Sequence, residues 1–136
     1  MSRARPETSS RCRRDERGST SIELLIILPA LFAVMFLGVQ AALYYHARTV
    51  AIAAAQEGAR TAGAEYGRTS EGISAAHAFI ADAGGNDVLL GPSVSGSRTA
   101  TVATVRVVGK SLSVIPGWAP VVRQSASVPV ERLTAP

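Results

Sequence analysis

Few residues of this chain have the types and spacing that catalysis or metal binding needs. The 136 residues include one cysteine, Cys12, and two histidines, His46 and His77. The sequence has no CxxC pair, no Gly-rich loop with a following Lys, and no histidine with a nearby acid and a serine in a nucleophile-elbow pattern. We therefore predict that the protein is not an enzyme, and we expect no catalytic residue, metal site, cofactor or small-molecule substrate.

The acid with the most informative surroundings is Glu23, because it stands at the entrance to a long uncharged segment. Leu24 to Ala47 carries no formal charge if His46 is neutral, and Gln40 is its only strongly polar side chain before that histidine. A charged residue at a bilayer centre costs on the order of 2.5–3.5 kcal/mol, and less near the interface. One interpretation of Glu23 is an interfacial glutamate that stabilises a helix N-terminus through the helix dipole.

A second interpretation of Glu23 depends on its distance from Gly18. If a peptidase cut between Gly18 and Ser19, Ser19 would become the first residue and would carry a new α-ammonium group. Glu23 would then be the fifth residue, one helical turn deeper. The sequence by itself leaves both interpretations open.

The uncharged segment has the length and the flanks of a single transmembrane helix. Its 24 residues would form a helix of roughly 36 Å, whereas the hydrocarbon core of a bilayer is about 30 Å thick. Six arginines lie in the first 17 residues, and Tyr44 and Tyr45 close the other end. Because cytoplasmic flanks carry the excess of Lys and Arg, we predict a cytoplasmic basic leader (1–18), a transmembrane helix in membrane lipid (19–47) and an extracytoplasmic remainder.

The formal net charge of +4 belongs mostly to that leader. No aromatic or base-reading pattern accompanies the arginines, so we expect no direct binding of nucleic acid.

A helical stem is predicted over residues 48–68, where alanine is abundant. Small residues recur at a spacing of four, which allows two backbones to approach closely. The surface would pack against a neighbouring stem or the protein's own domain, and the alternative is a stalk with high helix propensity. The predicted helix-packing residues are Ala51, Ala55, Gly58, Ala59 and Ala62.

Residues 69–136 are predicted to form a small α+β domain that begins with an amphipathic helix. We expect this helix from Glu71 to Ala83, with Thr69 or Ser70 as its N-cap and Gly84-Gly85 as its end. Its predicted apolar face consists of Ile73, Ala76, Phe79, Ile80 and Ala83.

After Asn86 the pattern predicts three or four short strands in an antiparallel sheet. Arg98 to Val108 is the clearest strand, with Ala103, Val105 and Val107 on one face. Gly91-Pro92 and Ser95-Gly96-Ser97 are typical of turns, Leu112 to Ile115 is expected to begin a strand, and Val121 to Val130 to form the last. Pro129 favours an edge position. So small a sheet needs cover from a helix or a partner, and Trp118 is interpreted as folding over it, with a partner anchor as the alternative.

The segment around Glu23 resembles the class III signal peptides of type IV prepilins, in which a basic leader ends in Gly, the apolar segment follows the cut and an acid is the fifth residue. Pro29, six residues after Glu23, and the AQEGAR segment from Ala55 to Arg60 narrow the resemblance to TadE-like proteins. These are minor pilins or pseudopilins of the Flp/Tad (tight-adherence) system. Leu24 and the long C-terminal region favour the minor class. The resemblance covers about residues 17–62.

This resemblance implies a membrane-anchored subunit that takes part in pilus assembly. A prepilin peptidase would cut between Gly18 and Ser19, and Glu23 would pair with the N-terminal amine of an adjacent subunit. Pro29 would kink the helix. The expected partners are the peptidase, other pilin-like subunits and the assembly platform, in the cell membrane or in a surface pilus.

Two alternative functions follow from the same residues. A secreted domain could be released by signal peptidase I at an Ala-x-Ala site such as Ala51-Ile52-Ala53, although the apolar segment exceeds a typical signal-peptide core. An uncleaved single-pass accessory or sensor protein would retain its leader.

Overall fold

A computed structural model describes the backbone of residues 17–132 and the side chains of residues 22–132. Most of the predicted leader, including Cys12, therefore lies outside the described residues. The chain divides into two compact units, Met1–Val34 and Met35–Pro136, and the division falls inside the first helix.

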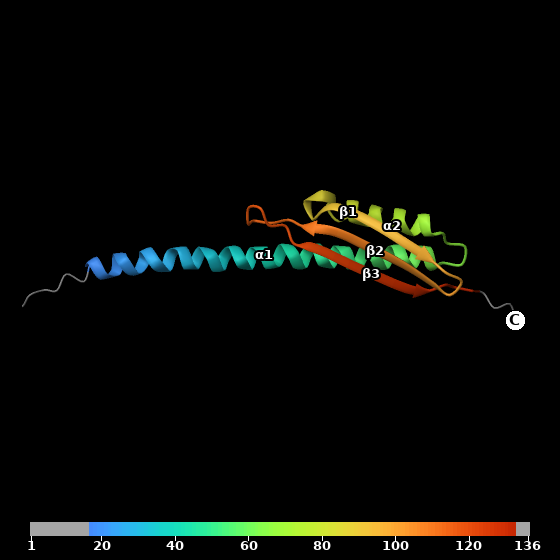
Figure 1. Ribbon diagram of the computed structural model, residues 1–136, viewed down its shortest axis with the longest axis horizontal. Coiled ribbons are helices and arrows are strands. Elements are labelled where there is room, and N and C mark those ends of the chain that lie inside the picture. Colours follow the sequence, from blue (N-terminus) through green and yellow to red (C-terminus); the bar gives the residue numbers. More distant parts are fainter. Residues whose placement is uncertain (1–16, 133–136) are drawn as a thin grey trace, which may run out of the picture. The chain divides into compact units, whose positions relative to one another are not determined.

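The described part of the chain is α+β, as the sequence predicted. It begins with a helix of 47 residues, α1 (Arg17–Gly63), followed by α2 (Thr69–Asp82) and a short 3-10 helix, η1 (Gly85–Asp87). Three strands follow: β1 (Leu89–Arg98), β2 (Val102–Ser111) and β3 (Val121–Pro129). Figure 1 shows these elements in chain order.

In the described residues of the N-terminal unit, only helix is present, and its apolar side chains are exposed. Ile22 to Val34 includes nine large apolar residues with between 48% and 75% of their surface exposed. Within the described residues, α1 is the one helix that is long and apolar enough to cross a membrane by length and composition. The prediction of a single N-terminal apolar helix is therefore confirmed at that level.

The C-terminal unit contains a three-stranded antiparallel sheet in the order β1-β2-β3. In β2, Val105 pairs with Gly96 of β1 and with Ala126 of β3. Ala103, Val105 and Val107 have no exposed surface, which confirms that they share one buried face. β3 is an edge strand and ends at Pro129, as the proline predicted.

Helices α1 and α2 both pack on the buried face of the sheet. A Cβ built on Gly58 of α1 would lie 3.0 Å from Val105 of β2, and one built on Gly96 of β1 would lie 3.0 Å from Thr69 of α2. In Figure 1 the strands run alongside α2 and the C-terminal part of α1. The sheet thus receives the helical cover that its small size requires.

Two predicted turns in the first strand are wrong. Gly91-Pro92 and Ser95-Gly96-Ser97 belong to β1, which pairs with β2 over most of its length. The register shifts between Leu90 and Ser93, and Gly91 has a φ of +54°. A β-bulge therefore accommodates the Gly-Pro pair without ending the strand.

Other local predictions also need correction. Leu112 to Ile115 forms no strand, because polar contacts with α1 determine its course, as described below. The residue before α2 is Arg68, not Thr69 or Ser70, and its backbone N–H donates to the Glu71 carboxylate at 3.1 Å. In α2, Ala76 and Ile80 are buried as predicted, but Phe79 is 36% exposed.

Candidate functional site

The residues of the predicted processing site lie in the first turns of α1. Gly18 and Ser19 are helical, although their side chains lie outside the description. Glu23 is exposed and follows Ser19 by four residues, a rise of about 6 Å along a helix. This spacing would let a carboxylate and a new N-terminal amine lie on the same side of the helix. The cleavage and the pairing both remain predictions.

Pro29 lies inside α1, and the helix is continuous through it. Proline removes one backbone donor and crowds the preceding turn, yet membrane helices tolerate it because neighbouring groups and local adjustments can satisfy the freed carbonyl. The predicted kink at Pro29 remains a prediction.

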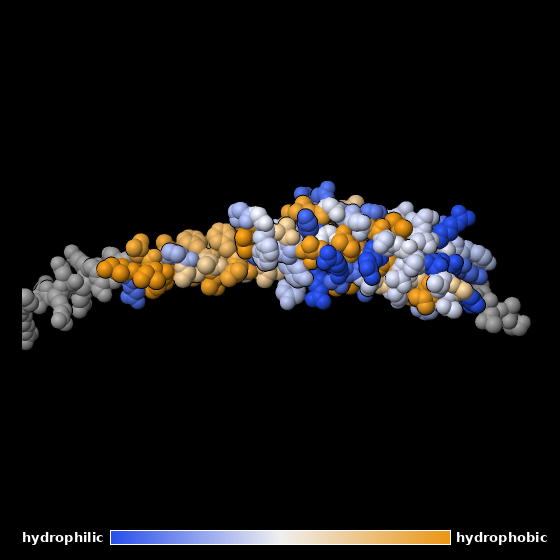
Figure 2. Space-filling view, viewed as in Figure 1, coloured by the Kyte–Doolittle hydropathy of each residue, from blue (hydrophilic) through white to orange (hydrophobic). Residues whose placement is uncertain are grey.

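The apolar surface of the N-terminal unit is well suited to lipid or to other helices. Figure 2 shows mostly hydrophobic residues over the first part of α1, whereas hydrophilic residues cover much of the visible surface of the sheet and α2. A helix that exposes large apolar side chains all round is typical of a membrane span, because no polar face remains for water.

Gln40 is buried, and it connects α1 to the loop between β2 and β3. Only 3% of its surface is exposed. Its amide oxygen accepts hydrogen bonds from the Ser113 hydroxyl at 2.9 Å and from the Val114 backbone N–H at 3.0 Å. Its amide nitrogen donates to the Leu112 carbonyl at 3.3 Å. The single strongly polar residue of the apolar segment before His46 therefore holds a loop more than 70 residues away in sequence.

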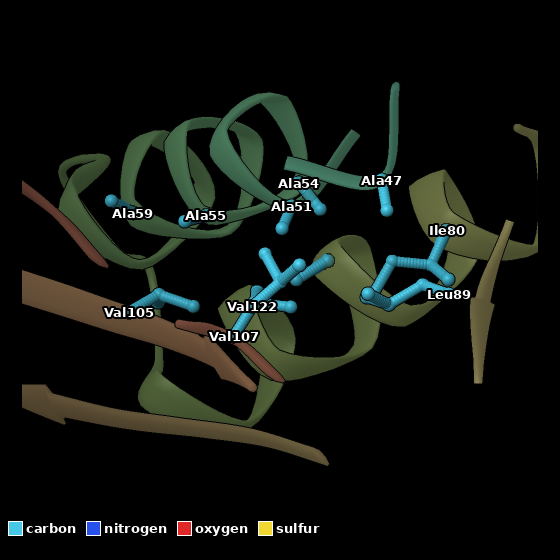
Figure 3. Packing of buried hydrophobic residues seen from close by; sticks show 11 residues of the cluster. Ala47, Ala51, Ala54, Ala55, Ala59, Ile80, Leu89, Val105, Val107 and Val122 are labelled. Carbon is cyan, nitrogen blue, oxygen red and sulfur yellow. The ribbon is translucent and has the colours of Figure 1, made fainter. Parts of the chain in front are cut away.

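The small residues of α1 pack within the C-terminal unit. Four of the five predicted packing residues, Ala51, Ala55, Ala59 and Ala62, have no exposed surface. Figure 3 shows Ala51, Ala55 and Ala59 in one cluster with Val105, Val107 and Val122 of the sheet. Of the possibilities that the sequence left open, the structure therefore shows packing against the protein's own domain.

Gly58, the fifth predicted packing residue, lies where α1 and α2 approach most closely. A Cβ added to Gly58 would lie 2.6 Å from the Gly72 carbonyl oxygen, and one added to Gly72 would lie 2.5 Å from the Gly58 carbonyl oxygen. Neither position has room for a side chain. The two glycines allow the two backbones to touch, and this contact lets both helices reach the same face of the sheet.

Backbone carbonyl groups at the C-terminal end of α1 accept hydrogen bonds from residues in and next to the sheet. The Arg98 guanidinium donates to the Ala64 carbonyl at 3.2 Å, and the Glu131 backbone N–H donates to the Gly63 carbonyl at 2.9 Å. Carbonyl groups at a helix end lack partners within the helix, and a cation near them is also favoured by the helix dipole. The end of α1 is thus held by Arg98, the last residue of β1, and by Glu131, which follows β3.

The titratable side chains of the described residues do not gather into a metal-binding cluster. No group of three or more His, Cys, Asp or Glu side chains there could hold a metal ion. Glu57 and Arg60 form an ion pair of 3.7 Å, with 45% and 76% of their side chains exposed. Such an exposed pair contributes little to stability.

Sequence reasoning assigned no role to Gln40 and did not select Gly72. For Gln40 the signal was present, since a lone polar side chain in an apolar segment usually has a specific partner. For Gly72 the only signal was a glycine inside a predicted helix, which lowers helix propensity and names no partner. Only the folded structure shows which residues Gln40 and Gly72 contact.

These features define a class of protein in which one apolar N-terminal helix, able to span a membrane, continues into a small α+β domain. In the comparison with protein families, residues 18–60 match the model of the TadE-like proteins, so this stretch of the chain is similar to them. The match covers most of α1 and ends before α2. No curated protein and no solved structure matches the chain.

Proposed function

We propose that this protein is a membrane-anchored minor pilin or pseudopilin that takes part in assembly of a Flp/Tad-type pilus. The observation that carries the proposal is the TadE-like match over residues 18–60, which begins at the predicted cleavage site and includes Glu23 and Pro29. In this function a prepilin peptidase cuts between Gly18 and Ser19. The protein is the substrate of that peptidase, not a catalyst.

The two parts of α1 have different roles in this proposal. Its first part is anchored in the membrane and then contacts the helices of other pilin-like subunits or the assembly platform. Its second part organises the domain, since its small residues are buried under the protein's own sheet. In this proposal the N-terminus is cytoplasmic and the domain lies outside the membrane, because cytoplasmic flanks carry the excess of Lys and Arg.

Glu23 has a specific role in assembly. After cleavage its carboxylate pairs with the α-ammonium group of Ser19 in an adjacent subunit, so that each charge offsets the desolvation of the other. This pairing fixes the axial offset between the helices of neighbouring subunits.

Release as a soluble domain by signal peptidase I is less compatible with the fold. A cut after Ala53 would detach Ala47, Val50 and Ala51, all of which belong to the buried core. The remaining sheet would lose much of its cover. An uncleaved accessory protein would keep the whole of α1 and its core contacts, and it differs from the proposal by its intact leader.

The proposal is tested by replacing Glu23 in cells that assemble the pilus. Breaking a buried ion pair costs about 3–5 kcal/mol, so Glu23→Ala is expected to lower the pilus yield at least about tenfold. Quantitative immunoblotting of sheared pili measures this yield, and membrane fractionation checks that the variant is inserted and cleaved. Glu57→Ala is the control, because Glu57 belongs to the same helix and to an exposed ion pair. Normal pilus assembly by an inserted and cleaved Glu23→Ala protein would contradict the pairing.

A further inference from the structure

An open apolar groove lies beside the loop that Gln40 holds. Its volume is about 480 Å³, and all of its lining belongs to the C-terminal unit. One wall comes from α1 and the other from the segment between β2 and β3. The lining residues that matter here are Leu37, Tyr44, Tyr45, Trp118, Pro120 and Val121.

Two aromatic residues of this groove, Trp118 and Tyr45, are amphipathic and exposed. Trp118 is 51% exposed and Tyr45 is 61% exposed. Tyr44 and Tyr45 lie edge to face, with their ring centroids 6.0 Å apart. Rings with an apolar body and a polar tip favour the boundary between lipid and water.

Cations lie on the outer face of the sheet next to the same loop. Lys110 pairs with Val121 in the sheet register, and Arg123 follows Val121 by two residues on the same face. Both cations line a second hollow together with Ala119 and Val121. Lys and Arg near a membrane surface are attracted by anionic headgroups.

The loop contacts α1 at the residue that directly follows its lipid-compatible segment. Ile22 to Val39 contains 18 residues, all exposed, and would span about 27 Å as a helix. Gln40 is the next residue and binds the loop. The aromatic groove therefore begins within one helical turn of the point where an apolar span of about one bilayer core ends.

We propose that the loop from Leu112 to Pro120, held by Gln40, rests in the interfacial region of the bilayer, with Trp118 and Tyr45 at the level of the lipid headgroups. This inference rests on the membrane anchoring in the proposed function, and it adds a second, peripheral contact with lipid. The contact fixes the depth of the domain at the membrane surface before the subunit enters an assembly. Gln40 is a positioning residue, because it contacts the loop and sets its height.

The chain contains a single tryptophan, so the native protein carries its own probe. The full chain is reconstituted in vesicles of phosphatidylcholine and phosphatidylglycerol, and co-flotation shows that it is anchored. Tryptophan fluorescence is then measured with brominated lipids whose bromines lie either near the headgroup or deep in the acyl chain. We expect the shallow bromines to quench about half or more of the Trp118 emission, and the deep bromines clearly less.

A matched control moves the probe to the other end of the domain. Tyr66 is 87% exposed and lies beyond the end of α1, so tryptophan should be tolerated there. In the double variant Trp118→Phe, Tyr66→Trp, neither brominated lipid should quench the emission appreciably. If Trp118 in co-floating protein is quenched no more than this control, the lipid contact is overturned. Blue-shifted emission without quenching would also overturn it, because another protein surface would then cover the groove.

The role of Gln40 is tested by comparing two alanine variants of α1. Gln40→Ala should reduce the shallow quenching of Trp118, because the loop loses its hydrogen bonds to α1, whereas Gln56→Ala changes an exposed residue of the same helix and should leave it unchanged. Equal quenching in both variants would overturn the positioning role. If the wild-type protein does not float with vesicles, the membrane anchoring itself is contradicted. If it floats but Trp118 is not quenched, only the interfacial contact is contradicted.

Discussion

Gln40 and Gly58 show how single residues of α1 determine the arrangement of elements that lie far away in the sequence. Gln40 is polar in an apolar segment and uses that polarity to hold the β2–β3 loop. Gly58 lacks a side chain, and this absence allows the backbone of α2 to approach. A glycine inside a helix costs about 0.5–1 kcal/mol relative to alanine, so close packing must compensate for its presence.

The packing role of Gly58 can be tested with two identical substitutions in one helix. Gly58→Ala places a Cβ 2.6 Å from the Gly72 carbonyl oxygen, whereas a Cβ at Gly38 meets nothing within 4 Å. We expect Gly58→Ala to destabilise the domain by about 1–3 kcal/mol despite its better helix propensity, and to lower the melting temperature by several degrees.

Thermal unfolding of the full chain in detergent, followed by circular dichroism, measures this difference. Gly38→Ala is the control and should leave the melting temperature unchanged or slightly higher, because it improves helix propensity without a clash. A Gly58→Ala protein that melts at or above the wild-type temperature would refute the close contact of α1 with α2.

At the scale of elements, α1 has two environments along one continuous helix. From Ile22 to Val39 its large apolar side chains are exposed, and from Ala47 to Ala62 its small side chains are buried. The large residues are suited to lipid, while the small ones allow the sheet and α2 to approach. The two segments therefore differ in residue size and also in hydrophobicity, since Arg48, Glu57 and Arg60 lie in the second segment.

Adjacent residues of α1 offer a test of this division. Ala55 has no exposed surface, whereas the next residue, Gln56, is exposed. Ala55→Leu should destabilise the domain by about 1–3 kcal/mol through overpacking, while Gln56→Leu should change its stability by no more than about 0.5 kcal/mol. Chemical denaturation of the detergent-solubilised protein measures both values. Equal effects of the two substitutions would mean that this face of α1 is not buried in the domain.

Much of the element pattern could be predicted from local signals. The apolar segment, the alanine-rich continuation and the alternation around Val105 each indicate an element by composition or period. β1 was missed as a full strand because its Gly, Pro and Ser residues are typical of turns, and only pairing with β2 makes them extended. The loop after Ser111 was mistaken for a strand because its partner is Gln40, more than 70 residues earlier.

The candidate site could be predicted from the sequence only in part. Gly18, Ser19 and Glu23 lie close together in the sequence, and their roles in cleavage and pairing stay predictions. The packing residues of α1 were selected by their size and period, but the sequence could not choose between the protein's own domain and a neighbouring stem. That choice depends on Gly72 and on the buried face of the sheet, whose positions result from the whole fold.

At the scale of the whole molecule, the account links a TadE-like N-terminal stretch to a domain built on the same helix. Cleavage at the start of α1 would leave both the apolar span and the domain core intact. Cleavage near Ala53 would remove part of that core, and no cleavage would keep the basic leader on the protein. The three possible N-termini therefore correspond to three different functions.

The most direct test of the account is the N-terminus of the protein in cells. Mass spectrometry of membrane and shed fractions, with the prepilin peptidase present or deleted, identifies the first residue. The account predicts a start at Ser19 that depends on the peptidase, which places Glu23 at the fifth position. A start near Ala54 to Gln56, or an intact Met1 or Ser2 in the presence of the peptidase, would contradict it.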